Sequence, residues 1–144
     1  MPSEKERNAY NELSFYTLSH QSPSFIHQLI VDAFAAQCAD EQTKPISITF
    51  ALIGLYLHLE KGFTGKEVQR AHMELAKKKH VWPKIPLPKQ RGKITIFSVL
   101  QEPDGSKRDA IIECWCESVW EAYKDAHEQI ADLLKKSGLK KLSS

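Results

Sequence analysis

The most apolar stretch of the chain covers residues 46–60. Its clearly polar positions are Ser47, Thr49, His58 and Glu60. A helix that is apolar on nearly every side is either buried or spans a membrane. At about 15 residues, this stretch is shorter than the roughly 20 residues that a bilayer requires. We therefore predict that residues 46–60 form the buried central helix of a small helical bundle.

Apolar residues spaced three and four positions apart predict further helices around this centre. The expected ranges are 23–39, 66–79 and 107–136, with shorter helices over 9–19 and 95–100. No stretch shows sustained alternation of apolar and polar residues, which is the pattern of a strand. The prediction is therefore an all-α fold, a single-domain bundle of about five helices, four of them substantial. Residues 1–8 and 137–144 are expected to be the flexible ends of this domain, which covers residues 1–144.

Residues 81–88 break the helical pattern with Pro83, Pro86 and Pro88. Proline removes a backbone donor and clashes inside a helix, so we expect an extended, polyproline-like segment. The surrounding stretch, residues 77–93, carries lysines and an arginine but no acidic residue, and it includes Trp82. Basic charge beside an aromatic ring can bind a polyanion. The simpler interpretation is a solvated helix end followed by a loop.

Composition adds little to this picture of the fold but narrows the possible partners. The formal net charge of +2 argues against nucleic acid as a partner, and nothing indicates a membrane. The three cysteines, without a secretory signal at the N-terminus, are typical of a reduced, cytoplasmic protein. Homo-oligomerisation is left undecided by these features.

Polar residues on the apolar faces are the candidates for chemistry. On the helix expected over residues 23–39, His27 falls near the middle of the apolar face, Gln37 at its edge and Asp32 on the opposite side. Histidines on inward or edge stripes of three helices, His27, His58 and His127, could bind one divalent transition metal. The alternative is that each histidine is only a hydrogen-bonded residue of the core or its rim, because no His-Glu-x-x-His or Cys-x-x-Cys motif accompanies them.

A stripe on the central helix, Ser47, Ala51, Gly54 and His58, carries mostly small residues. Such a stripe allows a neighbouring helix or a ligand to approach closely. We therefore expect a polar pocket among the helices that binds a metal ion or a small molecule. Its candidate lining residues are His27, Gln37, Ser47, His58, Trp120, Tyr123 and His127.

These residues assign no catalytic role, and they suit an enzyme or a binding protein equally. Two non-enzymatic alternatives stand beside the pocket. One is an interaction module that uses the basic, proline-rich stretch 77–93. The other is a scaffold in which the buried polar groups only hold the helices in register, with no ligand at all.

Two motifs resemble an uncharacterised, mostly bacterial protein family, a domain of unknown function. The first is His-x4-Asp-Ala-Phe-x2-Gln, which begins at His27 and ends at Gln37. The second is Glu-Ser-Val-Trp-Glu-Ala-Tyr over residues 117–123, with His127 four residues further on. The resemblance covers nearly the whole chain. It implies a single helical domain without an assigned activity.

Overall fold

A computed structural model of the chain describes residues 2–20, 25–78 and 81–139. These residues form seven α-helices and one short 3-10 helix, and they contain no strand. The helices are α1 (Glu4–Ser19), α2 (His27–Cys38), α3 (Pro45–Lys61), α4 (Gly65–Ala76), α5 (Ile96–Gln101), α6 (Ser106–Ala122) and α7 (His127–Ser137). The all-α prediction is confirmed, whereas the count of about five helices is too low.

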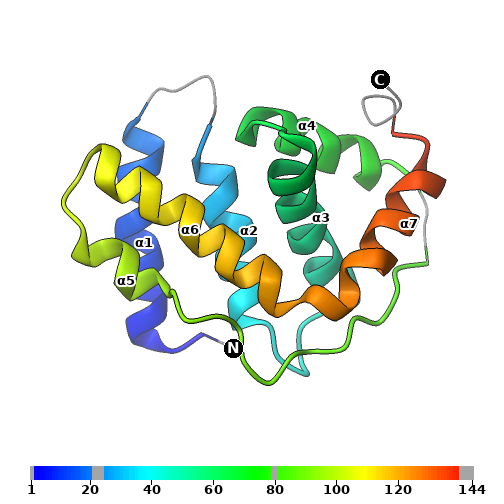
Figure 1. The fold of residues 1–144 in the computed structure, drawn as a ribbon, viewed down its shortest axis with the longest axis horizontal. Helices are drawn as coiled ribbons and strands as arrows, with labels where there is room; N and C mark the ends of the chain where they lie inside the picture. The colour runs from blue at the N-terminus through cyan, green and yellow to red at the C-terminus, as the bar shows by residue number, and fades with distance from the viewer. Residues whose placement is uncertain (1, 21–24, 79–80, 140–144) are drawn as a thin grey trace.

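Helix α3 is the most apolar element and lies in the interior, as predicted. Its Leu52, Ile53, Leu55 and Leu57 are fully buried. Helices α2, α4, α6 and α7 all pack against it. Helix α2 is nearly as central, because α1, α3, α4 and α6 contact it from different sides. Figure 1 shows this pair in the middle of the molecule, with α1 and α5 at one end and α7 at the other.

The helix ends follow local rules of capping. The side chains of Ser3 and Glu6 cap α1 reciprocally, so this helix begins at Glu4 rather than near Ala9. Helix α3 ends at Lys61 and is followed by Gly62, whose φ of 71° is the left-handed conformation expected of a glycine C-cap. The predicted start of the second helix at Pro23 lies outside the described residues, as do the predicted end of the fourth at Lys79 and residues 140–144 of the tail.

The single long helix predicted over residues 107–136 is wrong. Helix α6 stops at Ala122, a 3-10 turn covers Lys124–Ala126, and α7 starts at His127. At the break, the backbone N–H of Tyr123 donates to the carbonyl oxygen of Trp120 over 3.0 Å. The ring Nε2 of His127 bonds to the same oxygen at 2.7 Å. The side chain of His127 thus bonds to a carbonyl oxygen that a backbone N–H would pair with in a continuous helix, and this contact fixes the bend.

The proline-containing segment, residues 81–95, crosses from α4 to α5 without regular structure (Figure 1). Residues 81–88 are therefore not helical, as predicted. Arg91 fastens it to the body of the protein, because Nη1 donates to the carbonyl oxygen of Ala39 over 2.6 Å at the end of α2. Gln37 adds bonds from its Nε2 to the carbonyl oxygens of Arg91, at 3.1 Å, and Ile94, at 2.7 Å. Gly92 has a φ of 96°, and a Cβ there would press on the backbone of Ser118.

Among the described residues, none of the helices combines the length and the apolarity that a membrane crossing demands. This agrees with the expectation for residues 46–60, whose length is set by Pro45 at the start of α3 and Gly62 at its end.

Candidate small-molecule site

The three histidines predicted to share a metal do not come together. Among the described residues, no group of three or more histidine, cysteine, aspartate or glutamate side chains is placed to hold a metal ion. His27 Nδ1 lies 2.9 Å from Thr17 Oγ1, and His127 stacks on Trp120 with ring centroids 3.7 Å apart. Each histidine therefore has a partner within the protein, and a bound metal stays a prediction that this arrangement does not support.

His58 forms the best-defined polar contact of the three. Its Nδ1 lies 2.7 Å from the carbonyl oxygen of Phe63, and its Nε2 lies 2.7 and 2.9 Å from the two carboxylate oxygens of Glu113. A carbonyl oxygen only accepts, so Nδ1 must donate to it. The hydrogen bond to Glu113 raises the pKa of His58, although burial of the ring opposes this. The pair joins the end of α3 to α6.

Gln37, Trp120 and Tyr123 also serve the packing of the helices. Gln37 Oε1 accepts from Trp115 Nε1 over 2.9 Å, in addition to its two bonds to the segment 81–95. Trp120 Nε1 donates to Glu60 Oε2 over 3.1 Å, and the hydroxyl of Tyr123 donates to the carbonyl oxygen of Ala36 over 2.6 Å. These side chains stay candidates for ligand contact, but their polar atoms are used inside the protein.

A cavity of about 380 Å³ lies between α2, α3 and α4. Of the seven candidates from the sequence, Ser47 alone lines it. The remaining lining residues are Gln28, Val31, Asp32, Ala35, Ile46, Phe50, Ala51 and His72. The small-residue stripe of α3 contributes Ser47 and Ala51 to this lining, and Gly54 of the same stripe lies against the side chain of Asp32.

Asp32 is the most unusual residue of this cavity, because it is a carboxylic acid with only 3% of its surface exposed. Its Oδ1 accepts from Gln28 Nε2 over 3.2 Å, whereas Oδ2 has no hydrogen-bond partner among the described residues. Burial raises the pKa of Asp32 well above its usual range, and the bond from Gln28 offsets this only in part. Desolvation therefore favours the neutral, protonated acid.

His72 faces Asp32 across the side chain of Gln28. Its Nε2 donates to the carbonyl oxygen of Phe50 over 2.9 Å, and its Nδ1 lies 3.5 Å from Gln28 Nε2. Burial lowers the pKa of His72, so the neutral ring is favoured. In that tautomer, Nδ1 is an acceptor. The ring also stacks on Phe50, with centroids 5.2 Å apart.

The prediction that Asp32 lies on the outer side of its helix is wrong. Periodicity assigns only the apolar face of a helix to the core, but α2 is covered on several sides by α1, α3, α4 and α6. Its inward set is Leu29, Ile30, Asp32, Ala33 and Ala36. Gly54 was the available signal, since a glycine inside a buried helix indicates that another group lies against it.

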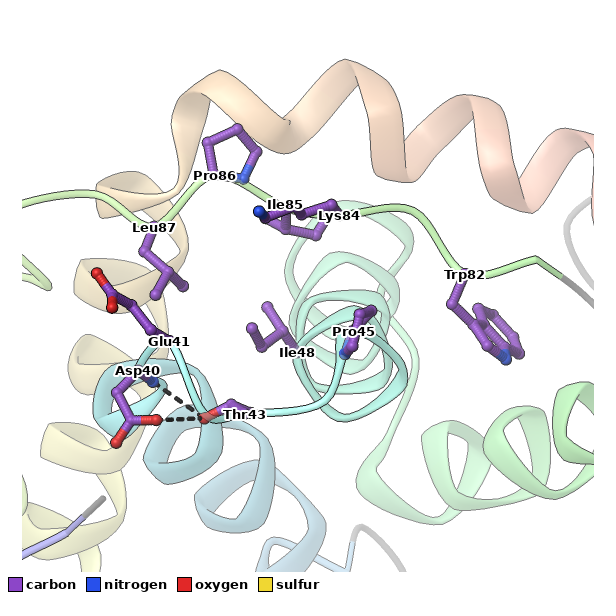
Figure 2. Close-up of a pocket in the computed structure, with 10 residues that line it drawn as sticks. All are labelled: Asp40, Glu41, Thr43, Pro45, Ile48, Trp82, Lys84, Ile85, Pro86 and Leu87. Atoms are coloured by element: carbon purple, nitrogen blue, oxygen red, sulfur yellow. Dashed lines mark hydrogen bonds between the residues drawn. The ribbon is translucent and has the colours of Figure 1, made fainter.

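A second hollow, of about 590 Å³, lies between the segment 81–95 and the start of α3. Figure 2 shows Leu87 and Ile48 facing this hollow from the two sides, with Asp40 and Thr43 bonded to each other at its edge. Glu41 lines the hollow as well, so acidic residues accompany Lys84 there. The basic stretch 77–93 is therefore not a uniformly positive surface.

Together, the fold and the cavity define an all-helical protein with a buried acid at the wall of a small pocket. A family model described as a family of unknown function, DUF5946, matches residues 7–124. The chain therefore belongs to this family, in agreement with the resemblance noted from its motifs. Neither the curated proteins nor the solved structures contain a match to the chain.

Proposed function

We propose that the protein binds a small molecule in the cavity between α2, α3 and α4. One observation carries the proposal: Asp32 lines the cavity as a buried carboxyl group, and its Oδ2 lacks a partner among the described residues. Leaving a buried polar atom unpaired costs about 1–3 kcal/mol, so such atoms are rare in folded proteins unless they have a role. Oδ2 itself lies against Gly54 of α3, so a ligand in the cavity would offset this cost by bonding to the carboxyl group as a whole.

The cavity has the mixture of surfaces that small-molecule sites use. Phe50 and Val31 supply apolar area, whereas Gln28, Ser47 and His72 supply polar groups. A volume near 380 Å³ falls within the range of about 300–1,000 Å³ for known ligand pockets. The pairing of a raised pKa at Asp32 with a lowered pKa at His72 is also a feature of functional sites.

Fragment screening by NMR tests this proposal. Fragments should shift the backbone amide signals of Gln28, Ser47 and His72 in the unaltered chain. Ala35→Trp should abolish these shifts, because Ala35 lines the cavity and is exposed, so an indole can fill the space without entering the core. Ala110→Trp is the matched control, since this exposed alanine lies on α6, outside the cavity.

The scaffold hypothesis predicts a different result. If Asp32 only holds α2 and α3 in register, fragments will leave the three amide signals unchanged, or will shift them equally in Ala35→Trp. Either result would exclude the cavity as a binding site. The same screen addresses the metal hypothesis when zinc is added, because binding at His27, His58 or His127 would shift signals away from the cavity.

A further inference from the structure

We propose that the ligand of this cavity is a small organic cation, an amine whose ammonium group pairs with the Asp32 carboxylate. The inference rests on the proposed function and specifies its ligand class. In the binding step, the Asp32 acid releases its proton to solvent. The carboxylate then accepts hydrogen bonds from the ammonium group, so charge is conserved and no covalent bond between heavy atoms changes.

The groups that line the cavity include hydrogen-bond acceptors that suit an ammonium group. Asp32 lines it with a carboxyl group whose Oδ1 accepts from Gln28 and keeps a second lone pair, whereas Oδ2 lies against Gly54 of α3. Nδ1 of a neutral His72 is also an acceptor. The nearest amide donor, Gln28 Nε2, is already directed at Asp32 Oδ1 and at the His72 ring. A ligand with several N–H donors therefore complements this site better than a ligand with acceptors only.

The lining of the cavity supplies no positive charge to balance Asp32, as far as the described residues show. The described residues that line the cavity include no lysine or arginine. The charge of Asp32 acts on Tyr10 of α1 and Cys116 of α6, and burial raises the pKa of each. From α4, the ring of His72 faces Asp32 across Gln28, and from α3, Gly54 lies against the carboxyl group.

None of these neighbours supplies a positive charge, since burial favours the neutral, protonated forms of Tyr10 and Cys116 and the neutral ring of His72. The positive charge that would make a buried carboxylate favourable must therefore arrive with the ligand. Isolated buried charges are costly, whereas paired and hydrogen-bonded ones are tolerated.

Aromatic rings provide the second element of cation recognition. Phe50 lines the cavity, and its ring forms a T-shaped pair with that of Trp82, with centroids 5.1 Å apart and an interplanar angle of 82°. A cation near the face of an aromatic ring is attracted by the ring quadrupole. A ligand that carries both an ammonium group and a short apolar body would contact Asp32 and Phe50 together.

Calorimetry with benzylammonium and benzyl alcohol tests the proposal, because the two probes share a ring and differ in charge. We expect benzylammonium to bind the unaltered chain with release of one proton, measured as a dependence of the heat on the buffer. Below the pKa of Asp32, the affinity of the chain for benzylammonium should fall about tenfold for each unit by which the pH is lowered. Benzyl alcohol should bind at least about tenfold more weakly.

Asp32→Asn keeps the shape of the side chain and removes the charge. This change should weaken the binding of benzylammonium at least about tenfold and abolish the release of a proton on binding. Asp125→Asn is the matched control, because Asp125 is exposed on the 3-10 helix and lies outside the cavity. The proton count is measured on the unaltered chain, so it does not depend on whether Asp32→Asn folds.

Two other outcomes are distinguishable. If benzyl alcohol binds as tightly as benzylammonium and no proton is released, the cation inference is overturned while the binding cavity stands. If neither probe at millimolar concentration shifts the NMR signals of the Asp32 carboxyl carbon or the His72 ring, both the cation inference and the proposed function are overturned.

Discussion

The carboxyl group of Asp32 on α2 occupies the space that a side chain at Gly54 of α3 would fill. A Cβ at Gly54 would overlap Asp32 Oδ2, and it would lie 2.5 Å from Asp32 Cγ. Glycine is thus required here by close approach, since an alanine in the middle of a helix would otherwise be favoured by about 1 kcal/mol. This contact ties the packing of the two central helices to the site.

We expect Gly54→Ala to destabilise the protein, because Asp32 or the helix must move to admit a methyl group. The expected loss is about 1–3 kcal/mol in the free energy of unfolding, as for other overpacked cores. Urea denaturation measures it. In an Asp32→Ala background the same change should be neutral or stabilising, since the opposing carboxyl group is gone. Equal losses in the two backgrounds would show that the contact with Asp32 is not responsible.

Asp32 should make the protein less stable as the pH rises. Its pKa is raised in the folded state, so the native protein holds more protons than the unfolded chain from about pH 3.8 up to the folded-state pKa. Across this window, stability falls by up to about 1.4 kcal/mol for each unit of pH. Asp32→Asn should remove this contribution, which is obtained as the difference between the two stability curves. Asp125→Asn should leave the curve unchanged.

Apolar periodicity was sufficient to predict α3, because a helix buried on all sides has an unambiguous composition. It was insufficient at the break between α6 and α7. The apolar spacing continues through Val119, Tyr123, Ala126 and Ile130, so the pattern alone indicates one helix. The bend depends on the ring of His127 at the Trp120 carbonyl oxygen, which is a contact between side chain and backbone that periodicity does not encode.

The site was harder to predict than the fold for a related reason. Periodicity assigns one buried face to a helix, and Asp32 lay outside the face chosen for α2. Its burial follows from contacts with several helices that are distant in sequence. The residue types on α3 do point toward the site, since the sequence pattern identifies Ser47 and the stripe that includes Gly54. Their grouping with Gln28 and His72 required the tertiary structure.

The pair of His58 and Glu113 should contribute stability that is lost as the pH rises through the raised pKa of His58. The pKa of His58 is raised by its bond to Glu113. The contribution is therefore full below the unfolded value of 6.5 and disappears as the pH rises through the folded-state pKa. Because 45% of the Glu113 side chain is exposed, we expect no more than about 1 kcal/mol.

An NMR titration of the His58 ring checks this directly. Glu113→Gln should lower the pKa of His58, since it removes both the charge and the strongest acceptor. Glu117→Gln is a useful comparison, because Glu117 raises the pKa of His58 by charge alone and is the last of the five influences on it. A larger effect from Glu117→Gln than from Glu113→Gln would contradict the assigned hydrogen bond.

Replacing Gln37 by leucine should be strongly destabilising, although leucine has a similar size and suits a helix. The change leaves three groups without their partner: Trp115 Nε1 and the carbonyl oxygens of Arg91 and Ile94. Trp115 is fully buried, whereas Arg91 and Ile94 are partly buried. At about 1–3 kcal/mol for each unpaired buried group, and less for the partly buried ones, we expect a loss of about 3 kcal/mol in the free energy of unfolding. Gln101→Leu, at an exposed position in α5, should change stability by less than about 0.5 kcal/mol. Adding Trp115→Phe to Gln37→Leu should cost less than the same change in the unaltered chain, because the indole N–H has then already lost its acceptor.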